Sequence, residues 1–205
     1  KVKPEPKREE KPAPKIPMPP KEVPSTADEL LDVTLGYESV PVSQMRKTIA
    51  RRLAESKFGA PHYYLMVDVD MERVIRMRER INAIAESRGQ KKVSFNDIVI
   101  KASAAALRLH PKVNASWLDK EGEIRRFKDI HIGVAVAVEE GLLTPVVRHA
   151  DRKGVTQIAE EVQSLAERAR QKKLQPPDWE GSTFTTSNLG MFGIERFTAI
   201  INPPN

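Results

Sequence analysis

Cysteine is absent from the 205-residue sequence, and aromatic residues make up 5% of it. The lack of cysteine excludes a disulfide framework, a thiolate metal site and a cysteine nucleophile, and it weakly favours a reducing compartment. No apolar run approaches the roughly 20 residues that a membrane-spanning helix needs. The amino end shows Lys, Pro and Glu where a signal peptide would have an apolar stretch. We therefore expect no membrane partner.

Positive charge is in slight excess, with 34 Lys and Arg against 28 Asp and Glu and a net charge of +6. Residues 1–24 contribute +3 of this net charge and contain eight of the 16 prolines. Dense prolines fix φ and remove backbone donors, so this segment predicts an extended, flexible linker. Residues 25–40 predict a transitional arm, and 41–205 a single domain. The sequence lacks the basic stripe with interleaved aromatics that nucleic-acid binding favours, so we expect no nucleic-acid partner.

Apolar residues at helical spacing predict four helices, near residues 43–53, 71–88, 94–110 and 158–169. The helix from residue 94 is apolar nearly all round, so we expect it in the core. Alternating or β-rich segments predict strands at 62–70, 130–138, 182–187 and 197–202, a short hairpin of 113–118 with 123–127 around Gly122, and extended structure at 141–148. In the 130–138 strand the face with His131, Gly133 and Ala135 is mostly small, which allows another element or a ligand to approach. The fold class is therefore mixed, α/β or α+β.

Several common catalytic motifs are missing. The four histidines, His62, His110, His131 and His149, show no metal-ligand spacing, so we expect no metal site. Neither a phosphate-binding glycine loop nor the GxSxG elbow of serine hydrolases occurs.

Two polar residues remain as candidates. Ser187 ends a Ser/Thr-rich strand before a glycine-containing turn, where its hydroxyl could donate a hydrogen bond into a cleft. The residues alone favour ordinary turn chemistry, in which Ser and Asn bond the local backbone. His62 follows a proline at a strand start, where it could be a base or a packed core residue, and packing is again favoured.

Five blocks of sequence closely resemble the catalytic domain of dihydrolipoamide acyltransferases, the core components of 2-oxo acid dehydrogenase complexes. In chain order, they are PVSQMRKTIARRL at 41–53, PHYYL at 61–65, SFNDIVIKAS at 94–103, GLLTPV at 141–146 and STFTTSNLGMFGIERFTAIINPP at 182–204. Their wording is most similar to the pyruvate dehydrogenase branch, whose acyl group is acetyl.

The resemblance implies an enzyme that transfers an acetyl group between dihydrolipoamide and coenzyme A. The family's catalytic serine falls on Ser187, where it would stabilise the tetrahedral oxyanion. This favours the functional role over turn chemistry. The family's general base belongs to an HxxxDG motif, which none of the four histidines matches. We therefore expect a member cut at both ends, without lipoyl and subunit-binding domains and without the histidine segment, and inactive as it stands. The resemblance does not identify the coenzyme A contacts.

The implied fold resembles chloramphenicol acetyltransferase, a mixed sheet flanked by helices, here expected to be incomplete at its carboxyl end. The implied assembly is a homotrimer that builds a large core. Its partners are the 2-oxo acid dehydrogenase and dihydrolipoamide dehydrogenase components, and the lipoyl group is carried on a separate domain. The compartment is the bacterial cytoplasm or the mitochondrial matrix. The alternative function is a non-catalytic scaffold component with the same fold.

Overall fold

The computed structural model describes residues 37–139 and 141–202. Contacts divide the chain after Pro41 into two units, and the elements below belong to the second. The linker predicted for residues 1–24 and most of the arm predicted for 25–40 lie outside the described residues. Within the described part, no helix has the length and apolar content needed to cross a membrane.

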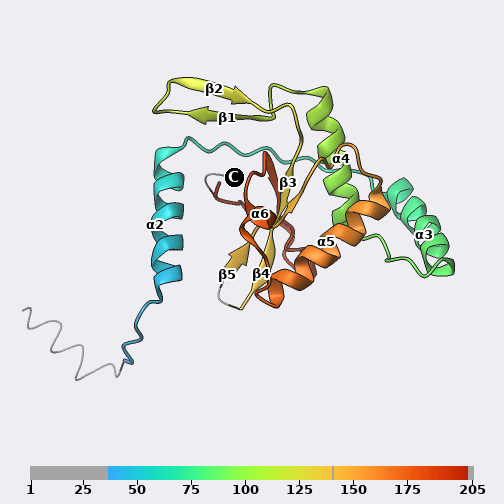
Figure 1. Cartoon of the computed structure of the whole chain (residues 1–205), viewed down its shortest axis with the longest axis horizontal. Helices are drawn as coiled ribbons and strands as arrows, with labels where there is room; N and C mark the ends of the chain where they lie inside the picture. Colours follow the sequence, from blue (N-terminus) through green and yellow to red (C-terminus); the bar gives the residue numbers. More distant parts are fainter. Residues whose placement is uncertain (1–36, 140, 203–205) are drawn as a thin grey trace, which may run out of the picture. The chain divides into compact units, whose positions relative to one another are not determined.

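The helices expected from apolar spacing are all present (Figure 1). They are α2 Gln44–Gly59, α3 Glu72–Ser87, α4 Phe95–Leu109 and α5 Val155–Arg170. Side-chain caps fix the starts of two of them. The hydroxyl of Ser43 accepts a hydrogen bond from the backbone N–H of Arg46 at 3.3 Å, and Ser94 forms a capping box with Asp97. A further one-turn helix, α6 Pro176–Trp179, starts on the two prolines that follow Gln175.

The central strand of the fold is β3, which joins a three-stranded sheet in the order β6-β3-β7. The bounds are β3 Ile132–Val134, β6 Val146–Val147 and β7 Phe184–Thr186. Strand β6 pairs antiparallel with β3, and β7 pairs parallel with it. Two antiparallel hairpins accompany this sheet: β1 Ala115–Leu118 with β2 Glu123–Arg126, and β4 Val136–Val138 with β5 Gly141–Leu143. The first of these hairpins confirms the sequence prediction.

Gly133 allows β3 and β7 to come together closely. A Cβ atom at this position would lie 3.2 Å from the Oγ1 atom of Thr185 and 3.3 Å from both the Cβ and Oγ atoms of Ser182. These distances are tighter than ordinary van der Waals contact, so a Cβ atom here would force the Thr185 and Ser182 side chains to shift. The small face predicted for the 130–138 strand therefore serves the approach of another element, β7.

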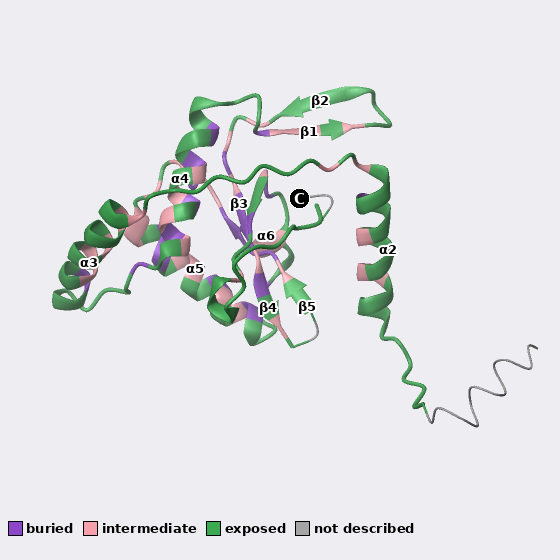
Figure 2. Ribbon diagram, turned by 180° about the vertical axis from the view of Figure 1, so that it is seen from behind, coloured by how far each residue is buried: buried purple, intermediate pink, exposed green. Residues whose placement is uncertain are grey.

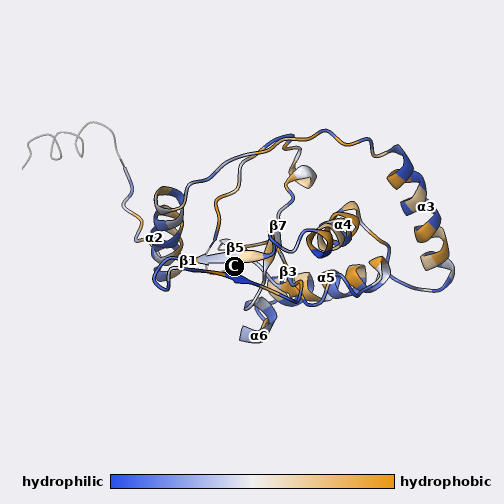
Figure 3. Cartoon of the chain, turned by 90° about the horizontal axis from the view of Figure 1, so that it is seen from above, coloured by the Kyte–Doolittle hydropathy of each residue, from blue (hydrophilic) through white to orange (hydrophobic). Residues whose placement is uncertain are grey.

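The apolar core lies where α4 and α5 pack against each other and against the strands (Figure 2). Its fully buried members come from both helices and the sheet: Ile100, Ala104, Ile130, Ile132, Val147, Ile158 and Ala169. Helix α4 is rich in apolar residues (Figure 3), but Val99 and Leu109 are exposed. The prediction that this helix lies in the core is confirmed by Ile100, Ala104 and Leu107, although the described residues cover only one face of it.

Two predicted strands are not strands in the structure. Residues 62–70 and 197–202 are extended but pair with no other strand among the described residues. The alternating side chains at 63, 65 and 67 are 81% to 82% exposed. Alternation shows that a segment can form a strand, but the strand also needs a partner edge to bond its backbone groups.

The strand predicted over 130–138 is divided in two at Ala135. The backbone N–H of Ala135 donates to the backbone oxygen of Thr186 at 3.0 Å, at the end of the β3–β7 pairing. Beyond this point the chain changes partner, since Val136 pairs with Leu143 of β5. The change of partner ends the pairing with β7 just before Ser187.

A charged contact holds α6 on α5 and thereby fixes the chain that enters β7. The guanidinium of Arg168 donates to both carboxylate oxygens of Asp178, at 2.8 and 3.1 Å. From the other side, Arg148 donates to the backbone oxygens of Pro177 and Glu180 at 2.7 and 3.0 Å. Two arginines therefore hold the turn that precedes the β7 segment.

We expect Ile132→Ala to destabilise the protein by about 2–5 kcal/mol, because it removes a side chain from the centre of the core. Ile132 is 0% exposed, whereas Ile124 is 58% exposed. Ile124→Ala is therefore the matched control, and it should change the free energy of unfolding by less than about 0.5 kcal/mol. Denaturant unfolding of both variants measures the difference, and equal losses would contradict this core.

We expect Asp178→Asn to lower the Tm at neutral pH. The backbone N–H of Gln175, followed by the side chain of Arg168, holds the pKa of Asp178 below its usual range although burial opposes this shift. A carboxylate with a lowered pKa stabilises the folded state above its unfolded pKa of about 3.9. This contribution is lost as the pH falls through the folded pKa. The Tm gap between variant and wild type should therefore narrow below about pH 4.

Thermal melts across that pH range measure the gap, with Asp68→Asn as the control. Asp68 is exposed in the extended segment after α2. A gap that stays constant on acidification would show that Asp178 acts through packing and not through its charge.

Candidate active site

A cleft of about 1460 Å³ opens beside the end of β7. Its walls come from α2, the segment leading into β3, β5 with Thr144, the segment before β7, and the extended segment 197–202. Ser187 lies in its lining, together with His131 and Thr183. The cleft therefore gathers polar groups from segments that are far apart in sequence.

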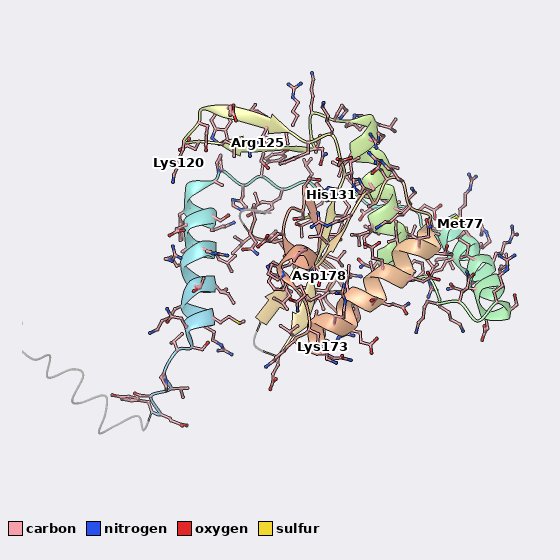
Figure 4. The ribbon with its side chains drawn as sticks, in the orientation of Figure 1. Met77, Lys120, Arg125, His131, Lys173 and Asp178 are labelled. Carbon is pink, nitrogen blue, oxygen red and sulfur yellow. The ribbon has the colours of Figure 1, made fainter. Side chains whose placement is uncertain are left out.

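The parallel pairing of β3 with β7 orders these polar groups along the cleft. The paired residues are Ile132–Val134 and Phe184–Thr186, with Gly133 opposite Thr185. His131 and Thr183 therefore precede the pairing and Ser187 follows it, and all three line the cleft. An imidazole thus lies near one end of the pairing and a serine hydroxyl near the other. Figure 4 shows the labelled His131 at β3.

Ser187 follows the last residue of β7 and is exposed to the cleft. The hydrogen bond to the turn backbone that was considered for Ser187 is made by its neighbour Asn188. The Oδ1 atom of Asn188 accepts a hydrogen bond from the backbone N–H of Gly190 at 2.8 Å. The Ser187 hydroxyl makes no hydrogen bond with the other residues in 37–139 and 141–202. It is therefore available to a molecule in the cleft.

His131 is held by a backbone group that follows β6, the strand paired with β3. Its Nδ1 atom accepts a hydrogen bond from the backbone N–H of His149 at 3.0 Å, and the two rings meet edge to face with centroids 4.6 Å apart. His149 has a φ of +48°, a left-handed conformation that few residues other than glycine adopt. Burial, followed by the charges of His149 and Arg148, lowers the pKa of His131, which favours the neutral ring.

The Asp129, His131 and His149 side chains form the one histidine-containing cluster in the described part of the chain that resembles a metal site, with ligand atoms within 4.8 Å of one another. Its chemistry does not suit a metal ion. A neutral imidazole has one free lone pair, and that of His131 is already engaged at Nδ1. Arg152 donates to the Oδ1 atom of Asp129 at 2.7 Å, so the carboxylate already has a cation.

His62 has a structural role, as the packing alternative suggested. Its Nδ1 atom lies 2.7 Å from the backbone oxygen of Ala60, and its Nε2 atom accepts from the backbone N–H of Ile201 at 3.3 Å. The hydroxyl of Ser56 donates to the backbone oxygen of Ile201 at 2.5 Å. With both ring nitrogens engaged, His62 ties the 197–202 wall of the cleft to the chain after α2 and is not available as a base.

The sequence patterns did not identify His131 and Thr183 as residues of the cleft. A signal for His131 was present, since it alternates with the small residues Gly133 and Ala135 on a face expected to admit a ligand. Its hydrogen bond from His149, 18 residues later, depends on the β3–β6 pairing and leaves no local pattern.

Comparison with known proteins identifies the family. The family model of the 2-oxoacid dehydrogenases acyltransferase catalytic domain matches residues 34–205. The chain is 51% identical over 168 residues to the mitochondrial dihydrolipoyllysine-residue acetyltransferase component of the pyruvate dehydrogenase complex of Schizosaccharomyces pombe, covering 82% of this chain and 34% of that protein. It spans about a third of the length of the curated relatives it matches.

Solved structures show the same relationship. Azotobacter vinelandii dihydrolipoamide acetyltransferase, studied for the roles of a serine, a histidine and an asparagine in its catalytic mechanism, matches with a TM-score of 0.79 and 34% identity over 91% of this chain and 74% of that one. The cubic core of a pyruvate dehydrogenase multienzyme complex matches with a TM-score of 0.79 and 33% identity over the same shares. These likenesses confirm the mixed, chloramphenicol-acetyltransferase-like fold class. The chain belongs to the family of 2-oxoacid dehydrogenase acyltransferase catalytic domains.

Proposed function

We propose that the cleft beside Ser187 is the acyl-transfer site of a dihydrolipoamide acetyltransferase, which moves an acetyl group between dihydrolipoamide and coenzyme A. The observation that carries this proposal is the placement of Ser187. Its hydroxyl follows a strand whose position is fixed by pairing with β3, lies in the cleft, and is not used by the local turn. These relatives are named as acetyltransferase components, which supports acetyl as the acyl group that is transferred.

The proposed chemistry is a thioester exchange. The attacking thiol loses its proton to a general base, and the thiolate forms a bond to the thioester carbonyl carbon. The carbonyl oxygen becomes an oxyanion, to which the Ser187 hydroxyl donates a hydrogen bond. Collapse of this intermediate breaks the original carbon–sulfur bond, and the departing thiolate takes up a proton. Ser187 thus stabilises charge that exists in the transition state and not in the substrate.

The histidines near the cleft do not supply this base. The lone pair of His131 accepts a backbone hydrogen bond, and both ring nitrogens of His62 are engaged. The proposed base is the histidine of the HxxxDG motif that the family resemblance implies. The placement of Ser187 favours the enzyme over the alternative, a scaffold component with the same fold, because a scaffold has no need of an oxyanion donor.

Assembly into homotrimers that build a larger core is part of the same proposal. The side chains of Tyr63, Leu65 and Val67 are 81% to 82% exposed along a segment that alternates as a strand would, and contiguous apolar surface of this kind favours a protein partner. The cubic core among the structural relatives supports it. The 2-oxo acid dehydrogenase and dihydrolipoamide dehydrogenase are the proposed partner enzymes, in a bacterial cytoplasm or a mitochondrial matrix.

We expect Ser187→Ala in the full-length protein to lower kcat for acetyl transfer from acetyl-CoA to dihydrolipoamide by about 10²–10³-fold, the usual cost of one lost oxyanion donor. KM for both substrates should change little, because the interaction forms in the transition state. Ser164→Ala, an exposed serine on α5, is the matched control and should keep full activity. A Ser187→Ala enzyme with wild-type kcat would overturn the oxyanion role.

We expect the full-length protein to sediment as a trimer or a multiple of a trimer. Replacing Leu65 and Val67 together with Asp should shift it toward monomers, because two charges would be placed on the exposed apolar segment. Sedimentation velocity measures both states, with Asp substituted at the exposed, distant Leu109 as the control. A monomeric wild type at micromolar concentration would contradict the assembly.

A further inference from the structure

The imidazole of His131 has a fixed protonation pattern. Because its Nδ1 atom accepts a hydrogen bond from the His149 backbone N–H, which can only donate, the neutral ring carries its proton on Nε2. Protonation of Nδ1 would place two donors against each other. His131 is therefore a neutral N–H donor whose Nε2 atom is not used by the contact with His149.

This donor lies in the same cleft as Ser187, at the other end of the β3–β7 pairing. His131 and Thr183 precede the β3–β7 pairing, and Ser187 follows it. Thr183 and Ser187 are four residues apart and flank β7, and an extended chain of that length spans roughly 13 Å. The cleft thus has one polar end at Ser187, where the oxyanion is proposed to form. A second polar end lies at a separation that the extended side arm of a substrate could span.

The two proposed thiol substrates share a feature that matches this spacing. In dihydrolipoamide, and in the pantetheine arm of coenzyme A, an amide carbonyl is separated from the reactive sulfur by about eight bonds. Such a chain extends to roughly 10 Å, since three backbone bonds span about 3.5 Å. When the length of one hydrogen bond is added at the amide end, the total length of either arm is close to the separation of Thr183 and Ser187.

We propose that His131 is a substrate-positioning residue whose Nε2–H binds the amide carbonyl of a thiol-bearing substrate arm while the reacting group lies at Ser187. The proposal rests on the acyl-transfer function proposed above. A neutral donor suits a neutral amide oxygen, and the restrained His149 backbone keeps the donor in place without a ligand. The structure thereby provides a second fixed point for a flexible arm, which reduces the entropy lost when the thiol is aligned.

The test is equilibrium binding of coenzyme A and of dihydrolipoamide, each measured separately by calorimetry on the full-length protein. His131→Asn keeps an acceptor for the His149 N–H, at Oδ1, but has no donor at the reach of Nε2. We expect it to raise the Kd of one thiol substrate by about 3- to 10-fold, the usual value of one neutral hydrogen bond. A rise for coenzyme A assigns the pantetheine arm, and a rise for dihydrolipoamide assigns the lipoyl arm.

Two further variants distinguish the loss of a contact with the ligand from a structural effect of the substitution. His131→Gln places an amide N–H near the position of Nε2 and should restore the affinity, whereas His110→Asn, an exposed histidine outside the cleft lining, should change neither Kd. Unchanged Kd values in His131→Asn, or a loss that His131→Gln fails to restore, would overturn the proposal. His131→Ala, which also removes the donor, replaces the Asn variant if thermal melting shows that the latter is unfolded.

Binding also distinguishes failure of this inference from failure of the proposed function. If the wild type binds the thiols with the expected dependence on His131 but transfers no acetyl group, the acyltransferase assignment fails and the His131 contact stands. If the wild type is active and sensitive to Ser187→Ala, but its Kd values ignore His131, the function stands and this inference fails.

Discussion

The close parallel pairing of β3 with β7 is the constraint on which the rest of the site depends. Glycine at position 133 favours it, since a Cβ atom there would lie in tight contact with Thr185 and Ser182. The same pairing begins after His131 and Thr183, and it ends before Ser187, where Ala135 bonds Thr186. The segment that enters β7 is in turn held by two arginines at the α6 turn. Local backbone geometry thus decides where the proposed catalytic hydroxyl stands.

Most of the fold could be predicted from the sequence because its local signals agree with the final packing. Helix starts at Ser43 and Ser94 carry their own caps, and the hairpin around Gly122 carries its own turn. The mixed fold class followed from these elements. Residues 62–70 were predicted wrongly because their alternation is a property of the segment alone, whereas a strand also depends on a partner edge elsewhere.

The site could be predicted in part. Ser187 was identified through the resemblance of its surroundings to a family and not through its chemistry, since a serine before a turn is more often a turn residue. The structure adds that Asn188 makes the turn contact. The state of His131 was out of reach, because it depends on a backbone donor brought in by β6 and on the left-handed conformation of His149. Contacts between distant segments were therefore the part that local patterns did not contain.

In the proposed complex, the acyl group lies at Ser187 and its substrate arm extends toward His131. A crystal structure of the full-length protein with bound acetyl-CoA is the decisive experiment. We expect the thioester carbonyl oxygen within hydrogen-bond distance of the Ser187 hydroxyl and the pantetheine arm directed toward His131. An acetyl group bound away from Ser187, in another part of the molecule, would contradict it.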